Sequence, residues 1–252
     1  MFFKVELLKL LMYLLEFNDV VKKYGKKGVL NGVTFKIKEK EIFGLIGKSG
    51  SGKSTFLKVL MGMTKIEGGE ILFDKKDAKK YIQYLRGNTG FATQGNMLFD
   101  ELTTRENAYY FGDLYEMKKK VVREEFDKLI SLLSLDGFEN TLVKNLSGGM
   151  QKRANLLVSL IHQPKLLILD EPTVGLDTLL RNSLWEYIHK INDAGTTILV
   201  TSHLLEEIEQ NCDRIGILEQ GKIWGVATPA QYKKKFGKKK TLNEIFHEVL
   251  SV

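Results

Sequence analysis

The chain has 252 residues, of which 43% are hydrophobic and 27% charged, enough for one large α/β domain with its own core. This composition, with only three prolines, excludes a largely disordered chain. The single cysteine, Cys212, excludes an intrachain disulfide and suits a reducing compartment. No apolar run approaches the ~20 residues that span a bilayer, so membrane contact is expected only through a partner chain.

The net charge of +7 leaves nucleic acid, anionic lipid and a merely lysine-rich composition open. Lysines are spread along the chain, with two clusters near its end at 233–235 and 238–240. We interpret these clusters as a solvated tail rather than a specific binding patch, and nucleic acid is not an expected partner.

The first residues, 1–15, are nearly all apolar with a few charges between them. Two interpretations stay open. The segment is either a short amphipathic helix at a membrane surface, or the result of an upstream start codon before a domain that begins near Met12.

Alternation of apolar and polar residues over 33–38 predicts a strand with one buried face. The apolar run Ile42–Ile46 then ends at Gly47, and a glycine-rich turn leads into residues with helical apolar spacing. Residues 103–161 are predicted to be mostly helical. One apolar stripe there contains Val122, Phe126, Leu129, Ile130 and Leu133.

Two unbroken apolar runs, 166–169 and 198–200, are typical of central parallel strands covered on both faces. Residues 214–218 and 222–226, joined around Gln220 and Gly221, predict a closing β-hairpin. The order of elements therefore indicates an α/β fold with a mostly parallel sheet.

Residues 47–54 read Gly-Lys-Ser-Gly-Ser-Gly-Lys-Ser, the pattern of a P-loop placed between a strand and a helix. The glycines let backbone N–H groups turn toward phosphate oxygens, and the helix adds its positive N-terminal end. Lys53 reaches the β- and γ-phosphates, and the hydroxyl of Ser54 ligates Mg²⁺. The predicted phosphate-binding residues are Gly47, Lys48, Ser49, Gly50, Ser51, Gly52, Lys53, Ser54 and Thr55.

Two carboxylates, Asp170 and Glu171, stand at the end of the apolar strand 166–169, the edge where ligands bind in open α/β sheets. Asp170 is predicted to hold Mg²⁺ and Glu171 to polarise the attacking water as general base. Gln94 and His203 also follow predicted strands. They are candidates to contact Mg²⁺, the water or the γ-phosphate.

The run Leu146 to Gln151 precedes a helix whose apolar positions recur at spacings of three and four. Ser147 is a natural N-cap, and the glycines after it open backbone N–H groups to a second anion. Because the chain already has a P-loop, this second helix start indicates a site completed by another copy of the domain.

On these motifs the sequence resembles the ATPase subunits of ABC transporters, over residues from about 13 to 250. The family signature is the Leu-Ser-Gly-Gly-x-Gln run, and every family motif has a counterpart in order. The resemblance implies a P-loop core with a mostly parallel sheet, an N-terminal antiparallel β subdomain and a helical subdomain at about 95–160. It assigns 13–252 to one ABC ATPase domain and 1–12 to an N-terminal extension.

The resemblance also implies roles for single residues. Tyr24 stacks on the adenine of ATP, and Phe17 and Phe35 are the nearby alternatives if it does not. Ser147, Gly148, Gly149 and Gln151 contact ATP bound to a second copy, and Asp177 lies in a loop that contacts this copy. The implied catalytic residues are Glu171, His203, Lys53 and Gln94, and the implied Mg²⁺ ligands are Ser54, Gln94 and Asp170.

The implied function is to power transport from the cytoplasmic face of the membrane, through a separate integral-membrane subunit and as a head-to-tail dimer. Residues 98–103, 106–107, 111–115 and 241–246 resemble the drug, lipid and small-molecule exporter group. The P-loop departs from this group, which more often has Pro-Asn at positions 48–49 and Ala at 51.

Two other functions stay open. A soluble ABC ATPase of translation or DNA repair usually has two ATPase domains or a long coiled-coil insertion, whereas the interval from Gln94 to Ser147 has room only for a helical subdomain. A P-loop kinase would explain residues 47–54 but would leave the signature and His203 without a role.

Overall fold

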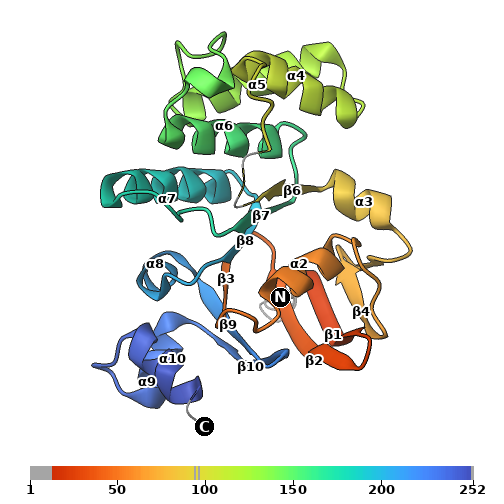
Figure 1. Ribbon diagram of the computed structural model, residues 1–252, viewed down its shortest axis with the longest axis vertical. Coiled ribbons are helices and arrows are strands. Elements are labelled where there is room, and N and C mark those ends of the chain that lie inside the picture. Colours follow the sequence, from red (N-terminus) through yellow and green to blue (C-terminus); the bar gives the residue numbers. More distant parts are fainter. Residues whose placement is uncertain (1–12, 94, 96, 251–252) are drawn as a thin grey trace, which may run out of the picture. The chain divides into compact units, whose positions relative to one another are not determined.

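The computed structural model describes residues 13–93, 95 and 97–250, which form two compact units (Figure 1). The first unit contains the described residues up to Leu85 and from Thr201 onward. The second unit contains the described residues from Arg86 to Val200. The predicted Gln94 lies outside the described residues.

The N-terminal part of the first unit is an antiparallel sheet with strand order β2-β1-β4-β5. In β2 the side chains of Val33, Phe35 and Ile37 are buried and those of Thr34 and Lys36 are exposed, which confirms the predicted alternation. The strands are β1 (Tyr13–Tyr24), β2 (Lys27–Lys38), β4 (Gly68–Phe73) and β5 (Lys76–Asp77).

An aromatic core joins this sheet to the helix that follows the P-loop, α2 (Lys53–Leu60). The ring of Phe56 in α2 lies 4.7 Å from that of Phe17 and 5.6 Å from that of Phe35, measured between centroids. Burial of such rings stabilises the contact of helix and sheet. This packing fixes α2, and with it the start of the helix, against the antiparallel sheet.

The start of β1 decides part of the question about the N-terminal segment. Tyr13 begins the strand, and Leu14 and Leu15 are buried within it. The amphipathic-helix interpretation is therefore wrong for residues 13–15, because their backbone pairs with β2 and β4 as part of a strand. Residues 1–12 lie outside the described residues.

A second group of strands in the first unit has the order β10-β9-β3. Strand β3 (Ile42–Ile46) runs parallel to β9 (Arg214–Glu219), and β9 forms an antiparallel hairpin with β10 (Lys222–Ala227). The predicted hairpin around Gln220 and Gly221 is confirmed. The helices here are α3 (Ile82–Gly87), which crosses into the second unit, α8 (Leu205–Asn211), α9 (Pro229–Phe236) and α10 (Leu242–Leu250).

The first lysine cluster, predicted as part of a solvated tail, belongs to helix α9, where Lys234 and Lys235 are exposed. Thr228 and Gln231 form a capping box at the start of this helix, and Pro229 occupies its first turn. Lys233 pairs with Glu209 at 2.5 Å, while Lys235 lies 4.8 Å from the ring of Trp224. Lysines in a last helical turn are favourable because they face the negative end of the helix dipole.

The predicted helical region contains three helices of the second unit, α4, α5 and α6, which pack against one another (Figure 1). A capping box between Thr103 and Glu106 starts α4, and the predicted apolar stripe of α5 is buried. The prediction of mostly helical structure over 103–161 is confirmed. The elements are α4 (Thr104–Leu114), α5 (Lys119–Leu132), a short 3₁₀ turn η1 (Val143–Asn145) and α6 (Gly148–Leu160).

The strands of the second unit follow the order β8-β7-β6, and β6 runs parallel to β7. The side chains of Leu166–Leu169 in β7 and of β8 are buried, as expected for strands covered on both faces. The elements are β6 (Thr89–Ala92), β7 (Leu166–Asp170), α7 (Thr178–Asp193) and β8 (Thr197–Thr201).

Candidate functional site

The P-loop connects β3 to α2 in the first unit. A Cβ atom on Gly47 would lie 2.4 Å from the carbonyl oxygen of Leu218 and 2.4 Å from Oγ of Ser51, so only glycine fits there. Lys48, Ser49 and Gly50 are exposed. The loop therefore has a constrained base and presents its middle residues to solvent.

Lys53 and Ser54 open α2 at the end of this loop. The ammonium group of Lys53 donates to the carbonyl oxygens of Gly47 at 2.6 Å and of Lys48 at 3.3 Å. The side chain thus folds over its own loop, next to the positive end of the helix, where phosphate groups bind. Ser54 is exposed in the first turn and offers a hard oxygen ligand of the kind that Mg²⁺ takes.

The hairpin turn between β9 and β10 supports the P-loop, a relationship that the sequence analysis missed. The N–H of Gly221 donates to the carbonyl oxygen of Ser51 at 3.2 Å. Asn31 of β2 holds the turn in place. Its backbone N–H donates to the carbonyl oxygen of Gly221 at 2.7 Å, and its side-chain amide donates to the carbonyl oxygen of Gln220 at 2.8 Å. These positions are far apart in the chain, so spacing in the sequence gives no signal for them.

Tyr24, predicted to stack on adenine, ends β1 with 49% of its surface exposed. The ammonium group of Lys22 lies 5.0 Å from its ring. Phe17 and Phe35 would be the alternatives, but both are buried and stack on each other with centroids 4.7 Å apart. They are wrong as adenine contacts, because the core of the antiparallel sheet encloses them.

His203 follows β8 at the C-terminal end of the strand, as predicted. The hydroxyl of Ser202 accepts a hydrogen bond from the N–H of Leu204 at 2.9 Å, which closes a tight turn around His203. The side chain of His203 is exposed. The turn therefore presents an imidazole directly after the end of a strand.

The two carboxylates lie at the end of β7 in the second unit, and both are partly buried. Glu171 has a φ angle of 53°, in the left-handed region that residues other than glycine seldom adopt. Such a conformation costs roughly 1–3 kcal/mol and tends to occur at functional sites. Its carbonyl oxygen accepts from Val174 at 3.3 Å, which closes the turn after the strand.

The signature run begins α6 in the second unit. Oγ of Ser147 accepts a hydrogen bond from the N–H of Met150 at 3.3 Å, which confirms the predicted N-cap. Gly148 is exposed, whereas Gly149 is buried. The side-chain amide of Gln151 donates to Val143 and to Leu146, each at 3.2 Å, and so braces the backbone before the signature.

Arg153 is a positioning residue that the sequence analysis missed. Its guanidinium donates to the carbonyl oxygens of Leu133 at 3.0 Å, Ser134 at 2.7 Å and Gly149 at 3.4 Å. It thereby ties the start of α6 to the end of α5. The only sequence signal is an arginine one helical turn after Gly149. Beside it, partial burial lowers the pKa of Lys152.

Asp177 caps α7, the helix that follows the carboxylates. Its Oδ1 accepts a hydrogen bond from the N–H of Leu180 at 3.0 Å, and the side chain is exposed. Arg181 donates to the carbonyl oxygen of Leu176 at 2.8 Å, which fixes the loop before the cap. The predicted contact loop is thus an ordered segment with a solvent-facing carboxylate.

The predicted site residues therefore fall into two sets. Tyr24, the P-loop, Ser54 and His203 belong to the first unit. The two carboxylates, the signature and Asp177 belong to the second. Among the described residues, no helix is both long enough and apolar enough to cross a membrane.

Comparisons with known proteins agree with this architecture. A family model described as ABC transporter matches residues 30–174. The linearmycin resistance ATP-binding protein LnrL of Bacillus subtilis is 33% identical over 224 residues, which cover 89% of this chain and 72% of that protein. The Nod factor export ATP-binding protein I of Rhizobium etli is 36% identical over 214 residues, which cover 85% and 68%.

Solved structures give the same result. The structure of an ATP binding subunit of an ABC transporter superposes with a TM-score of 0.84 at 27% identity and covers 94% of this chain and 99% of that one. The fold and the motifs thus define a P-loop ATPase of the α/β class. The chain belongs to the ABC transporter family, in which it is an ATP-binding and ATP-hydrolysing subunit. The predicted fold class, family and enzymatic activity are confirmed.

Proposed function

We propose that the chain powers export through a separate integral-membrane subunit, as one of two ABC ATPase domains that enclose ATP in a head-to-tail dimer. The observation that carries this proposal is the second anion-binding helix start, at Ser147. Its N-cap leaves Gly148 exposed and the positive end of α6 open to an anion. Because the P-loop of the chain already binds the phosphates of one ATP, we infer that the start of α6 contacts the ATP bound to the P-loop of a neighbouring copy.

In this proposal one copy binds ATP through the residues of its P-loop. Backbone N–H groups and Lys53 hold the phosphates, and Tyr24 stacks on the adenine. Ser54, Asp170 and Gln94 would hold Mg²⁺, because hydroxyl, carboxylate and amide oxygens are the ligands that this ion prefers. When bound, Mg²⁺ neutralises charge on the phosphates.

Hydrolysis would then depend on residues at the strand ends. Glu171 accepts a proton from the attacking water, and His203 and Gln94 orient the water and the γ-phosphate. Phosphoryl transfer needs positioned charge more than covalent help from the protein. The left-handed backbone of Glu171 supports such a role, since strain of this kind is kept where a side chain must point in one direction.

The second copy would complete the site. Ser147, Gly148 and Gly149 would contact the γ-phosphate, with Gln151 bracing the loop behind them, and Asp177 would contact the partner across the interface. Residues 13–252 would form the ABC ATPase domain, with a helical subdomain at about 95–160, and residues 1–12 an extension before it.

The names of two relatives support export as the direction of transport. One is named for Nod factor export and the other for linearmycin resistance. The chain would act on the cytoplasmic face of the membrane as a peripheral subunit. The transported substrate would be chosen by the integral-membrane partner.

The test is affinity purification of the tagged full chain from its native membranes. The expected result is recovery of one integral-membrane protein together with the chain, and an ATPase rate that rises when the two are reconstituted. Recovery with ribosomes or DNA-repair proteins, and no membrane protein, would favour the soluble ATPase instead.

A second experiment tests the shared site. Ser147→Arg is expected to leave ATP binding by the monomer intact and to abolish turnover, because the damage falls on the site of the partner. Asn145→Arg is the matched control, an exposed position two residues earlier, and should retain turnover. Equal loss of binding and turnover in Ser147→Arg would contradict the shared site.

A further inference from the structure

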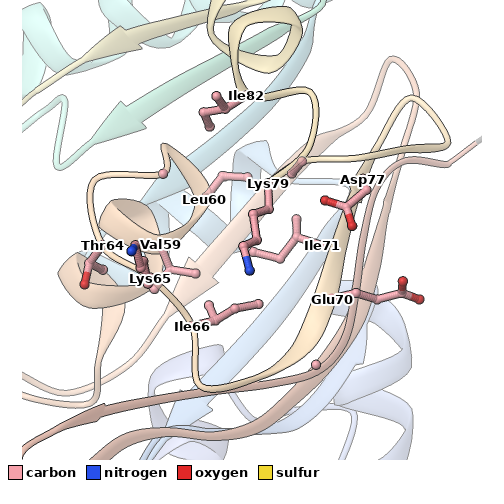
Figure 2. A pocket seen from close by; sticks show the side chains of 13 residues that line it. Val59, Leu60, Thr64, Lys65, Ile66, Glu70, Ile71, Asp77, Lys79 and Ile82 are labelled. Carbon is pink, nitrogen blue, oxygen red and sulfur yellow. The ribbon is translucent and has the colours of Figure 1, made fainter.

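A cavity of about 250 Å³ lies in the first unit, away from the P-loop (Figure 2). It is enclosed by the last turn of α2, the segment that follows it, strand β4 and the connection from β5 to α3. The apolar part of its lining consists of Val59, Leu60, Ile66, Ile71, Ala78 and Ile82. Its first lining residue in α2 is Val59, whereas the phosphate-binding loop ends at Thr55.

Four charged residues also line the cavity, but the two carboxylates are engaged elsewhere. Glu70 accepts a hydrogen bond from Asn18 at 3.0 Å, and Asp77 accepts one from the N–H of Lys80 at 2.9 Å. In Figure 2 the carboxylate of Glu70 points away from the apolar lining. Each of the two carboxylates thus already has a hydrogen-bond donor of its own.

The two lysines that line the cavity differ from the two carboxylates in their interactions. Lys65 and Lys79 make no hydrogen bond or ion pair with another described residue. Figure 2 shows the side chain of Lys79 extending across the apolar lining, and the residue is exposed. An apolar cavity with an unpaired cation at its mouth favours an anionic group joined to an apolar body.

We propose that this cavity binds a small carboxylate with an apolar body, with Lys79 as the partner of the carboxylate. The size supports one aromatic ring with a short chain, because an apolar cavity of about 150 Å³ already accepts benzene. Burial of the ring against the isoleucines provides affinity, and the ammonium group provides selectivity for the anion. The site is distinct from that of the nucleotide.

The probe is 4-phenylbutyrate, titrated into the full chain in the presence of saturating Mg-ADP and followed by protein NMR. We expect saturable binding with Kd on the order of 1 mM, which corresponds to about 0.3 kcal/mol of binding free energy per non-hydrogen atom of the probe. The shifted amide signals should include those of Ala78 and Ile82. The neutral amide 4-phenylbutyramide should bind at least about tenfold more weakly, since it lacks the charge.

Two variants separate recognition from general charge. Lys79→Glu should weaken 4-phenylbutyrate at least about tenfold, because an anion then faces an anion. Lys80→Glu makes the same change on the neighbouring exposed residue, which does not line the cavity, and should change affinity less than about twofold. Both positions are on the surface, and circular dichroism checks that both variants fold.

Three results would overturn the proposal. The first is equal binding of the amide and the carboxylate, and the second is equal loss of affinity in both lysine variants. The third is a set of signal shifts confined to residues 47–55, because the probe would then occupy the nucleotide site.

Discussion

Gly221 donates its backbone N–H to the carbonyl oxygen of Ser51 at 3.2 Å, so the hairpin turn between β9 and β10 supports the phosphate-binding loop. The φ angle of Gly221 is 75°, and a Cβ atom there would lie 2.2 Å from the carbonyl oxygen of Val29. The position therefore needs glycine for its conformation and for the space it leaves.

Gly221→Ala should consequently damage nucleotide binding from outside the motif. Strain at such a position costs roughly 1–3 kcal/mol of folding free energy. The displaced turn should also weaken ATP affinity by about fivefold or more, because Ser51 loses its support. Gly225→Ala, also in the hairpin region, is the control, since its Cβ would meet only the hydroxyl of Tyr232 at an ordinary 3.5 Å. Denaturant unfolding and titration with labelled ATP measure both effects. Equal affinities of the two variants would refute the supporting role.

Lys53→Ala should remove most of the nucleotide affinity. The bound phosphates would lose the charge-assisted hydrogen bonds of this ammonium group, and we expect Kd for ATP to rise roughly 30- to 100-fold. The control is Lys58→Ala, an exposed lysine in the last turn of the same helix. A titration with labelled ATP decides the matter, and unchanged binding in Lys53→Ala would contradict the phosphate role of the loop.

Tyr24→Ala tests the adenine contact. Stacking of a base on an aromatic ring is sequence-tolerant, so we expect roughly tenfold weaker ATP binding and partial acceptance of GTP by the wild type. Tyr24→Phe keeps the ring and should bind ATP within about twofold of the wild type. Tyr81→Ala removes an exposed tyrosine outside the predicted site and should have no effect. An ATP affinity of Tyr24→Ala within twofold of the wild type would show that Tyr24 does not contact the adenine.

The sequence predicted the parts of the site that are local. The cap at Ser147 can be predicted because its partner, Met150, is only three positions away in the chain. The strand ends at Asp170 and His203 can be predicted from the apolar runs that precede them. Arg153 was missed because its acceptors, Leu133 and Ser134, lie on another element.

Burial was harder to predict than secondary structure. Phe17 and Phe35 were plausible adenine contacts by position, yet both lie in the core of the antiparallel sheet. Alternation in a strand says which residues share a face, but not which face is covered. The cavity beside Lys79 was not predicted for a related reason, because three separate segments of the chain enclose it.

His162 predicts a dependence of stability on pH. Burial lowers its pKa from 6.5 to about 4, and its ring stacks on that of Tyr115 with centroids 3.7 Å apart. Because the folded state resists protonation, the unfolded state binds more protons between these values. The contribution of neutral His162 to the unfolding free energy is therefore complete above pH 6.5 and is lost as pH falls toward 4.

His162→Phe keeps a stacked ring and removes this titration. Between neutral pH and pH 5 the wild type should lose about 1–2 kcal/mol more unfolding free energy than the variant. His189→Phe, at an exposed position of α7, is the control and should lose as much as the wild type. Urea unfolding at both pH values provides the comparison. Parallel losses in wild type and His162→Phe would show that the imidazole does not titrate with folding.

Glu171→Gln connects the chemistry to the assembly. Glutamine keeps the size and the hydrogen-bonding reach of the side chain, and it meets the same left-handed backbone, but it cannot accept the proton from water. The hydrolysis rate should fall by ~10²–10⁴-fold while ATP affinity stays near that of the wild type.

If ATP joins two copies and hydrolysis releases them, the Glu171→Gln variant should accumulate as a dimer in Mg-ATP and return to monomer in ADP. Light scattering over a range of protein concentrations measures this, with Glu186→Gln on the exposed face of α7 as the matched control. A variant that remains monomeric at high concentration in Mg-ATP would argue against the shared site, and one that hydrolyses ATP at the wild-type rate would show that Glu171 is not the base.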